Sequence, residues 1–209
     1  MFSGIVEAKT ELIEYTPDDP RAPKQIQIKI KKPLNFNDIS RGDSIAINGV
    51  CMTVEVVAAD SLQFVVGAET LKITKWSENE LKSKELNIER SLKFSDRIHG
   101  HLVSGHVDGM ATITECHSIS GSQLIKVKIP EELLHYVWKK GSITLNGVSL
   151  TINEVSGSEI EVCLIPETLR STNLGKLHVG DRLTVESDQL ARAFRRQYEL
   201  ERSARELHT

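Results

Sequence analysis

A few side chains in this sequence are of the types that carry out acid–base or nucleophilic chemistry. His106 could act as a general acid or base, because imidazole titrates near neutral pH; the alternative is a hydrogen-bonded structural histidine. Cys51 could be a nucleophile or a small buried side chain. Ser149 and Thr151 alternate along an expected strand, so their hydroxyls share one face and could hydrogen-bond the polar edge of a ring. Lys140 precedes a glycine and could meet a phosphate, a carbonyl or solvent.

The histidines and cysteines do not form a pattern typical of a metal site or of disulfides. His99, His101 and His106 together could be metal ligands, since His-x-His on a strand points both rings to one side, but no acidic or cysteine ligands stand nearby, and we expect no metal. The chain has an odd number of cysteines without CxxC spacing, at Cys51, Cys116 and Cys163. This argues against a disulfide framework and a zinc cage.

An internal repeat relates several of these residues to one another. Three segments of the first half have counterparts in the second half, in the same order and about 100 positions further along. The matched pairs are Phe2–Val6 with Val103–Val107, Arg41–Val54 with Lys140–Ile152, and Glu69–Lys72 with Glu167–Arg170. A period of this length suits a duplication into two domains rather than a solenoid, whose repeats are shorter.

The two copies differ at positions where a side chain could act. Ile5 corresponds to His106, and Cys51 corresponds to Ser149. Two similar sites with unlike polar groups would suit a reaction that uses two like molecules in different roles. Drift after the duplication is the alternative explanation.

The residue pattern of each half predicts β-structure. Apolar residues alternate along Gln25–Lys31 and Leu124–Ile129, as on strands with one buried face. Ser44–Val57 and Ile143–Val155 are rich in β-branched residues, and each contains an Asn-Gly pair that is typical of a tight hairpin turn. Many short strands in each half favour a small closed barrel.

We expect one short helix in each half. Pro130–Trp138 begins with proline and acidic residues, as helices often do, and Leu34–Ser40 is its weaker counterpart. The stretch Glu78–Glu85 lacks the Gly-Asp pair that is present at Gly180-Asp181, and we interpret it as a remodelled surface loop.

The tail differs from both halves. Residues recur there at alternating spacings of three and four, with one polar member, at Leu190, Ala193, Gln197, Leu200, Ala204 and Leu207. Such a helix could pack on its own barrel, but a helix this polar gains little alone, and pairing with other subunits is favoured. With a charged linker at Glu85–Gly100, the sequence divides into domains 1–97, 98–188 and 189–209.

The overall composition excludes several classes of protein. A net charge of -3 offers nothing that would attract a nucleic-acid backbone, so we expect no nucleic-acid partner. The first residues do not resemble a signal peptide, and no apolar stretch approaches the roughly 20 residues that span a membrane. Apolar residues make up 39%, which is enough for ordinary cores. We therefore expect a cytoplasmic protein that has no membrane partner.

Several segments together resemble a known family. They are MFSGIVE at Met1–Glu7, INGVCMTV at Ile47–Val54, GHLVSGHVDG at Gly100–Gly109, LNGVSLTI at Leu145–Ile152 and IPETLRSTNLG at Ile165–Gly175. In combination they resemble the riboflavin synthase family of the α-chain type, whose members contain lumazine-binding repeats. The likeness runs from Met1 to about Asp188.

The resemblance implies a fold and a reaction. The fold would be all-β, with two tandem six-stranded Greek-key barrels, short helices and a C-terminal oligomerisation helix that gathers three chains into a homotrimer. Members convert two molecules of 6,7-dimethyl-8-ribityllumazine into riboflavin and 5-amino-6-ribitylamino-2,4-pyrimidinedione, the last step of riboflavin biosynthesis, and use no metal or organic cofactor. A four-carbon unit passes between the lumazines, in a site between the N-half of one subunit and the C-half of its neighbour. The resemblance also raises, without deciding, an association with lumazine synthase.

Carried over position by position, the resemblance implies two substrate pockets. The first would use Gly4, Ile5, Val6, Cys51, Met52, Thr53, Val65, Val66, Gly67, Ala68, Glu69 and Thr70, with Ser44 as a nearby polar group. The second would use Gly105, His106, Val107, Lys140, Ser149, Leu150, Thr151, Ile165, Pro166, Glu167, Thr168, Leu169 and Arg170. Which pocket holds the donor of the four-carbon unit stays open.

The expected chemistry gives the polar residues their roles. The C7 methyl group of one lumazine loses a proton, and hydrogen bonds from Ser149 and Thr151 would stabilise the resulting anion. The other lumazine accepts a nucleophile, which His106, Ser44 or Cys51 would deliver or activate, and no single obligatory base is assigned. The alternative function is that of a non-catalytic lumazine- or flavin-binding antenna protein.

Overall fold

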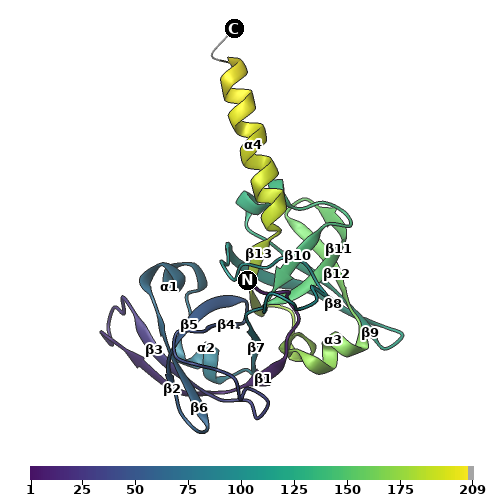
Figure 1. The fold of residues 1–209 in the computed structure, drawn as a ribbon. Helices are drawn as coiled ribbons and strands as arrows, with labels where there is room; N and C mark the ends of the chain where they lie inside the picture. The colour runs from purple at the N-terminus through teal and green to yellow at the C-terminus, as the bar shows by residue number, and fades with distance from the viewer. Residues whose placement is uncertain (207–209) are drawn as a thin grey trace.

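The computed structural model describes residues 1–206 and contains two β units followed by a long helix (Figure 1). The strands of the first unit are β1 (Ala8–Thr10), β2 (Leu12–Pro17), β3 (Ile26–Lys31), β4 (Ser44–Ile47), β5 (Val50–Val57), β6 (Ser61–Val66) and β7 (Leu86–Arg90). Those of the second unit are β8 (Gly109–Ile119), β9 (Ser122–Lys128), β10 (Ser142–Leu145), β11 (Val148–Ser156), β12 (Glu159–Leu164) and β13 (Arg182–Ser187). The helices are α1 (Ala68–Thr74), α2 (Glu78–Lys82), α3 (Pro166–Ser171) and α4 (Gln189–Glu206), with 3-10 helices η1 (Glu131–Tyr136) and η2 (Asn173–Lys176).

Both units follow the same antiparallel circuit. The second is a closed barrel with the order β10-β11-β12-β9-β8-β13. The first is a seven-stranded sheet with the order β1-β7-β4-β5-β6-β3-β2. Its two edge strands, β1 and β2, are separated in the chain by Glu11 alone, and together they take the place of the long strand β8. The predicted all-β fold of two barrel units with short helices and a C-terminal helix is confirmed, and the division at 97/98 and 188/189 stays a prediction.

Alternating side chains fill the inside of each unit. Ile26, Ile28 and Ile30 are at most 1% exposed and belong to one apolar core, while the second unit has a separate core. The predicted turns at Asn48-Gly49 and Asn146-Gly147 are confirmed. All four residues have positive φ, between 45° and 80°, which is the geometry of a tight hairpin that matches the twist of its strands.

These two hairpin turns meet where the units touch. A Cβ atom on Gly49 would lie 2.7 Å from the backbone nitrogen of Gly147, and a Cβ on Gly147 would lie 2.7 Å from that of Gly49. Any side chain there would push the units apart, so glycine permits this contact as well as the positive φ.

Hydrogen bonds repeat symmetrically around this contact. The Asn48 side-chain oxygen accepts from the Asn87 backbone N–H at 2.8 Å, and the Asn146 oxygen accepts from the Thr184 N–H at 2.9 Å. The Asn87 amide donates to the Asn146 carbonyl at 2.8 Å, and the Thr184 hydroxyl donates to the Asn48 carbonyl. Asn173 adds bonds that have no counterpart, since its oxygen accepts from the Asn87 side chain at 2.9 Å and its amide donates to the Asn48 oxygen at 3.0 Å.

Three short segments differ from the sequence-based predictions. The 34–40 segment forms turns rather than a helix, and the predicted helix at Pro130–Trp138 is the 3-10 helix η1. The predicted loop at Glu78–Glu85 instead contains α2. Its first turn is capped by the Ser77 hydroxyl, which accepts from the Glu80 N–H at 3.3 Å, and burial of Leu81 holds it to the first unit.

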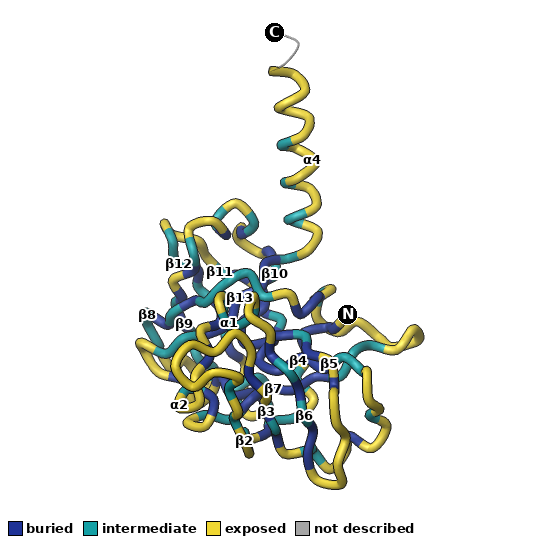
Figure 2. The backbone as a smooth tube through the Cα atoms, turned by 90° about the vertical axis from the view of Figure 1, so that its left-hand side faces the viewer, coloured by how far each residue is buried: buried dark blue, intermediate teal, exposed yellow. Residues whose placement is uncertain are grey.

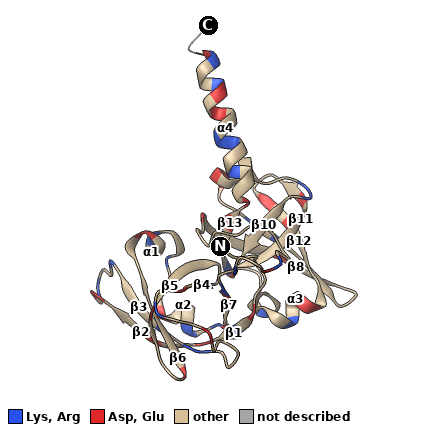
Figure 3. Cartoon of the chain, viewed as in Figure 1, with Lys and Arg blue, Asp and Glu red and all other residues tan. Residues whose placement is uncertain are grey.

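Helix α4 projects away from both units (Figures 1 and 2). None of its residues is buried, and Leu190 and Leu200 are 57% and 49% exposed, which contradicts the alternative in which it packs along its own barrel. Basic and acidic residues follow one another along its length (Figure 3). The last member of the predicted seam, Leu207, lies outside the described residues. None of the helices within residues 1–206 has the length and hydropathy needed to cross a bilayer.

We predict that Asn173→Ala destabilises the protein by about 1 to 3 kcal/mol, because buried donors and acceptors at the contact between the two units lose their partners. Asn173 is 2% exposed and bonds residues of both units. Chemical denaturation measures the change in the free energy of unfolding. The control is Asn35→Ala at an exposed position. An equal effect of both variants would contradict the role given to Asn173.

Candidate functional site

The predicted polar residues lie on the outer faces of the barrels. Along β5, Cys51 and Thr53 alternate with side chains that fill the first core, and along β11, Ser149 and Thr151 do the same in the second unit. Because successive side chains of a strand point to opposite faces, these four point outward, toward the joint or toward solvent. The barrel interiors are filled, and a ligand must therefore bind outside them.

Three residues expected in the pockets instead point into the cores. Met52, Leu150 and Val66 are 4%, 7% and 1% exposed and pack among the apolar residues of their units. The family resemblance implied them as pocket residues, but the strand alternation turns their side chains inward. Only their backbones remain available on the outer face.

Each outer face is covered by a segment that comes from the other half of the chain. The Ser149 N–H donates to the Gly4 carbonyl at 2.7 Å, and the Cys51 N–H donates to the Gly105 carbonyl at 2.8 Å. The grouping predicted from the sequence is therefore wrong: Gly4–Val6 belongs with the second unit, and Gly105–Val107 with the first.

Apolar contacts support this exchange. Val6 packs on the core of the second unit, and Val107 packs on that of the first. Between the two faces, Phe2 and Val103 form an isolated antiparallel bridge, and both are at most 1% exposed.

Two glycines allow the segments to lie this close to the strands. Gly4 and Gly105 have φ of +74° and +80°, a region that favours glycine. A Cβ on Gly4 would lie 2.7 Å from the Ser149 Cβ, and one on Gly105 would lie 2.5 Å from the Cys51 Cβ. Both contacts are too short for any other residue.

Two buried carboxylates hold the exchanged segments in place. Glu89 accepts from the Ser3 N–H at 2.7 Å, from the Ser3 hydroxyl at 3.0 Å and from the Gly4 N–H at 3.2 Å. Glu186 makes the equivalent bonds to the N–H and hydroxyl of Ser104, at 2.8 and 2.6 Å, and to the N–H of Gly105, at 3.0 Å. Neither carboxylate was predicted from the sequence, although Glu89 and Glu186 stand at equivalent positions of the repeat.

The two carboxylates have different electrostatic surroundings. An Arg192 nitrogen of α4 lies 3.7 Å from Glu186 and another lies 2.9 Å from Asp108. In the first unit, Arg90 is instead paired with Glu7 and Asp38. Burial raises the pKa of Glu89 to about 7, against the opposing effect of the hydrogen bonds from Ser3 and Gly4.

The predicted histidines do not come together. His106 is exposed, and within residues 1–206 its imidazole has no hydrogen-bond partner, which leaves the ring free to meet a ligand. His101 contacts the Ser149 hydroxyl, and His99 lines a separate cavity. Across the described part of the chain, no group of His, Cys, Asp and Glu is arranged to hold a metal ion.

The remaining predicted residues lie at the edges of the two faces. The segments after β6 and β12 start the short helices α1 and α3, and their first residues are exposed at Gly67, Ala68, Glu69, Ile165, Pro166 and Glu167. Thr70, Thr168 and Leu169 are half-buried and Arg170 is exposed. The exposed Lys140 turns the chain with φ of +69°, and Val65 is half-buried on β6.

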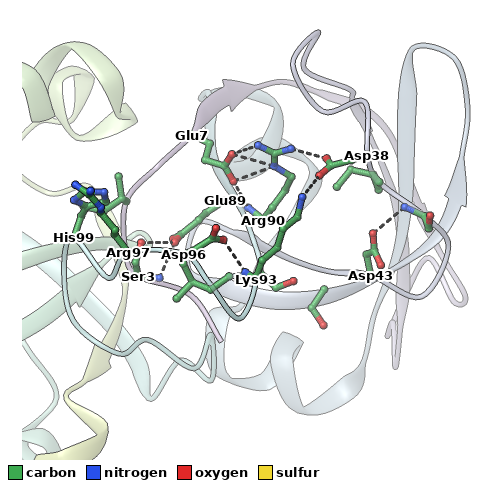
Figure 4. A pocket seen from close by; sticks show the side chains of 16 residues that line it. Ser3, Glu7, Asp38, Asp43, Glu89, Arg90, Lys93, Asp96, Arg97 and His99 are labelled. Atoms are coloured by element: carbon green, nitrogen blue, oxygen red, sulfur yellow. Dashed lines mark hydrogen bonds and ion pairs between the residues drawn. The ribbon is translucent and has the colours of Figure 1, made fainter.

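A cavity of about 710 Å³ adjoins the first unit (Figure 4). Its lining includes Ile5 and Ser44, and the N-terminal segment, the 38–44 segment and the 91–99 linker enclose it. Arg90 donates to Asp38 at 2.5 Å and Lys93 donates to it at 2.9 Å. The bonds from Lys93 and Arg90 lower the pKa of Asp38 to about 2, so this carboxyl stays ionised well below neutral pH.

Comparison with known proteins agrees with the repeat. The model of the lumazine binding domain family matches residues 3–91 and again residues 104–188. A riboflavin synthase of Mycobacterium tuberculosis is 37% identical, over 94% of this chain and 97% of its own length. The riboflavin synthase of Bacillus subtilis is 36% identical, over 92% of this chain and 87% of its own length.

Solved structures show the same fold. The crystal structure of LumP complexed with riboflavin superposes with a TM-score of 0.81 at 24% identity and covers 90% of this chain and 99% of its own. The crystal structure of LumP complexed with 6,7-dimethyl-8-(1'-D-ribityl) lumazine gives a TM-score of 0.78. At this level of identity the likeness concerns the arrangement of the two barrel units.

We predict that Glu89→Gln removes a pH dependence of stability. A buried carboxyl whose pKa is raised from 4.5 to about 7 contributes stability below pH 4.5 that is lost as the pH rises through 7. The free energy of unfolding of the variant, minus that of the unsubstituted protein, should therefore grow by roughly 3 kcal/mol between pH 4.5 and 8. Urea denaturation at a series of pH values measures it. A difference that stays constant over this range would contradict the burial argument.

Proposed function

The chain belongs to the riboflavin synthase family, and from this premise we propose that it converts two molecules of 6,7-dimethyl-8-ribityllumazine into riboflavin and 5-amino-6-ribitylamino-2,4-pyrimidinedione. The two products together contain the atoms of the two substrates, so the reaction is a four-carbon transfer, and we propose that the protein is a transferase that acts without an added oxidant or reductant. A cytoplasmic location and an association with lumazine synthase remain predictions.

The observation that carries this proposal is the presence of two equivalent outer faces with unlike polar groups. The first combines Cys51 and Thr53 with the segment that carries His106. The second combines Ser149 and Thr151 with the segment that carries Ile5. Equal backbones would bind the same ring in the same way, while unlike side chains give each ring its own role.

The exchange of segments groups the candidate residues by role. The segment that carries His106 covers the face on which Cys51 lies. Ser44 on β4 is the register partner of Thr53 on β5, which belongs to the same face. All three candidates for delivering or activating a nucleophile thus belong to the first unit. This supports a division in which the ring bound there accepts the nucleophile.

The ring bound at the second unit would then lose its C7-methyl proton. Ser149 and Thr151 would donate hydrogen bonds to the oxygens and nitrogens over which the negative charge spreads. Donors held by a folded strand cost no reorganisation when this charge develops, so they lower the barrier rather than only binding the substrate. Holding the two rings face to face would supply much of the acceleration, because well-oriented reactants gain up to about 7 to 11 kcal/mol.

Catalysis needs a neighbouring subunit in this proposal. Within one chain the bridged segments around Phe2 and Val103 stand between Cys51 and Ser149, so rings bound at the two faces are kept apart. A second chain can bring its second-unit face to the first-unit face of its neighbour. The exposed seam on α4 supports assembly into a homotrimer through that helix.

We predict that the purified protein, incubated with 6,7-dimethyl-8-ribityllumazine alone, forms riboflavin without an added cofactor. Riboflavin and the pyrimidinedione should appear in equal amounts, which liquid chromatography with absorbance detection measures. Tight binding of the lumazine without turnover would overturn the proposed enzymatic activity and would indicate a lumazine-binding protein instead. Failure to bind lumazine or riboflavin at micromolar concentration would overturn both.

We predict that Leu200→Glu dissociates the trimer and abolishes most turnover, because it places a charge in the exposed seam of α4. Analytical ultracentrifugation measures the assembly, and circular dichroism checks that the barrels remain folded. The control is Arg202→Glu, which changes the charge on the helix face opposite the seam. A trimer that survives Leu200→Glu at micromolar concentration would contradict the helix proposal.

A further inference from the structure

His101 contacts two hydroxyl groups of the second unit. Its Nδ1 lies 2.7 Å from the Ser149 oxygen, and its Nε2 lies 3.2 Å from the Thr144 oxygen. Thr144 and Ser149 are register partners on the paired strands β10 and β11. One imidazole therefore connects a cross-strand pair of hydroxyls and uses both of its nitrogens.

The surroundings of His101 fix its position. The His101 N–H donates to the Ser3 carbonyl at 3.2 Å. A Cβ on the preceding Gly100 would lie 2.1 Å from that same carbonyl oxygen and 2.7 Å from the Ser149 side chain. The backbone around His101 is thus pressed against the face that carries Ser149, and it cannot shift without moving the exchanged N-terminal segment.

The protonation of His101 determines where the Ser149 hydrogen points. Burial lowers the pKa of His101, opposed by the charge of Asp188, so the ring is neutral near pH 7 and has one donor and one acceptor. Thr144 is 1% exposed, and among residues 1–206 its hydroxyl has no hydrogen-bond partner other than this ring, so it donates to Nε2. Nδ1 then carries the hydrogen and donates to Ser149, whose own hydrogen is left for a ligand.

The first unit has no equivalent arrangement. The positions that correspond to Thr144 and Ser149 are Ala46 and Cys51, which are also register partners. Alanine cannot donate to an imidazole and a thiol is a weak hydrogen-bond partner. The histidine contact therefore belongs to one of the two faces only.

We propose that His101 is a positioning residue for the second-unit site: it orients the Ser149 hydroxyl so that its hydrogen points at the ring bound there. This inference rests on the proposed function. It assigns the donor role to Ser149 in preference to an acceptor role, and it makes Thr144 the end of a relay that runs Thr144 to His101 to Ser149 to substrate.

The kinetic test compares His101→Phe, which keeps a planar ring but removes both hydrogen bonds, with His101→Gln, which retains a donor and an acceptor. In the full chain His101→Phe should lower kcat about tenfold or more and change KM less than about threefold, because the oriented hydrogen matters most once charge develops. His101→Gln should recover part of kcat. The exposed His178→Gln serves as the control and should leave both parameters unchanged.

A double-mutant cycle shows whether His101 acts through Ser149. If it does, His101→Phe combined with Ser149→Ala should lose little more kcat than Ser149→Ala alone. Losses that multiply would overturn the proposal, as would a loss confined to KM or an equal loss in the Phe and Gln variants.

A measurement on the ligand-free protein separates this inference from the proposed function. The ¹⁵N chemical shifts of the His101 ring at pH 7 should report a hydrogen on Nδ1 and none on Nε2. The opposite tautomer, or a doubly protonated ring, would overturn the relay even in an active enzyme. A protein without turnover would instead refute the proposed function, and the ring shifts would still decide the relay.

Discussion

Two buried carboxylates determine how the chain builds its sites. Glu89 and Glu186 each accept three hydrogen bonds from a Ser-Gly pair, and in doing so they turn that pair onto the strand face of the other unit. Burying a carboxyl group is costly unless its oxygens are satisfied. The backbone N–H groups of Ser3, Gly4, Ser104 and Gly105 meet that requirement. If either segment left its place, the buried carboxyl group that holds it would lose its hydrogen-bond donors. The outer faces of both barrels depend on this exchange.

The exchange makes the two units interdependent although each has its own core. An isolated first unit would lack the segment that covers Cys51, and an isolated second unit would lack the one that covers Ser149. The contact between Gly49 and Gly147 and the bonds of Asn173 add a second point of attachment. A member of this family built in this way keeps two similar faces in a fixed relation while their side chains diverge.

The sequence repeat predicted most of the fold because it marks local features. Asn48-Gly49 and Asn146-Gly147 need positive φ, and alternating isoleucines need one buried face, so both can be recognised without knowledge of distant contacts. The grouping of segments could not be predicted in the same way. The bond from Ser149 to Gly4 links residues far apart in the chain, and a duplicated sequence fits an exchanged and an unexchanged arrangement equally well. Strand alternation alone predicts that Met52 and Leu150 point inward, whereas the family resemblance marks only their positions along the chain.

The two faces have the same backbone arrangement and differ in the side chains that the backbone carries. Ala46 and Cys51 sit at the same register positions as Thr144 and Ser149, so a histidine placed over the first pair would find no hydroxyl to donate to it. Over the second pair, the imidazole of His101 has a buried donor on one side and an outward-facing hydroxyl on the other. The change from alanine to threonine at a buried position therefore matters as much as the change from cysteine to serine at the face. Divergence of a duplicated site can begin beneath the face that we propose binds the ligand, where the buried Thr144 hydroxyl decides which way the half-buried Ser149 hydroxyl points.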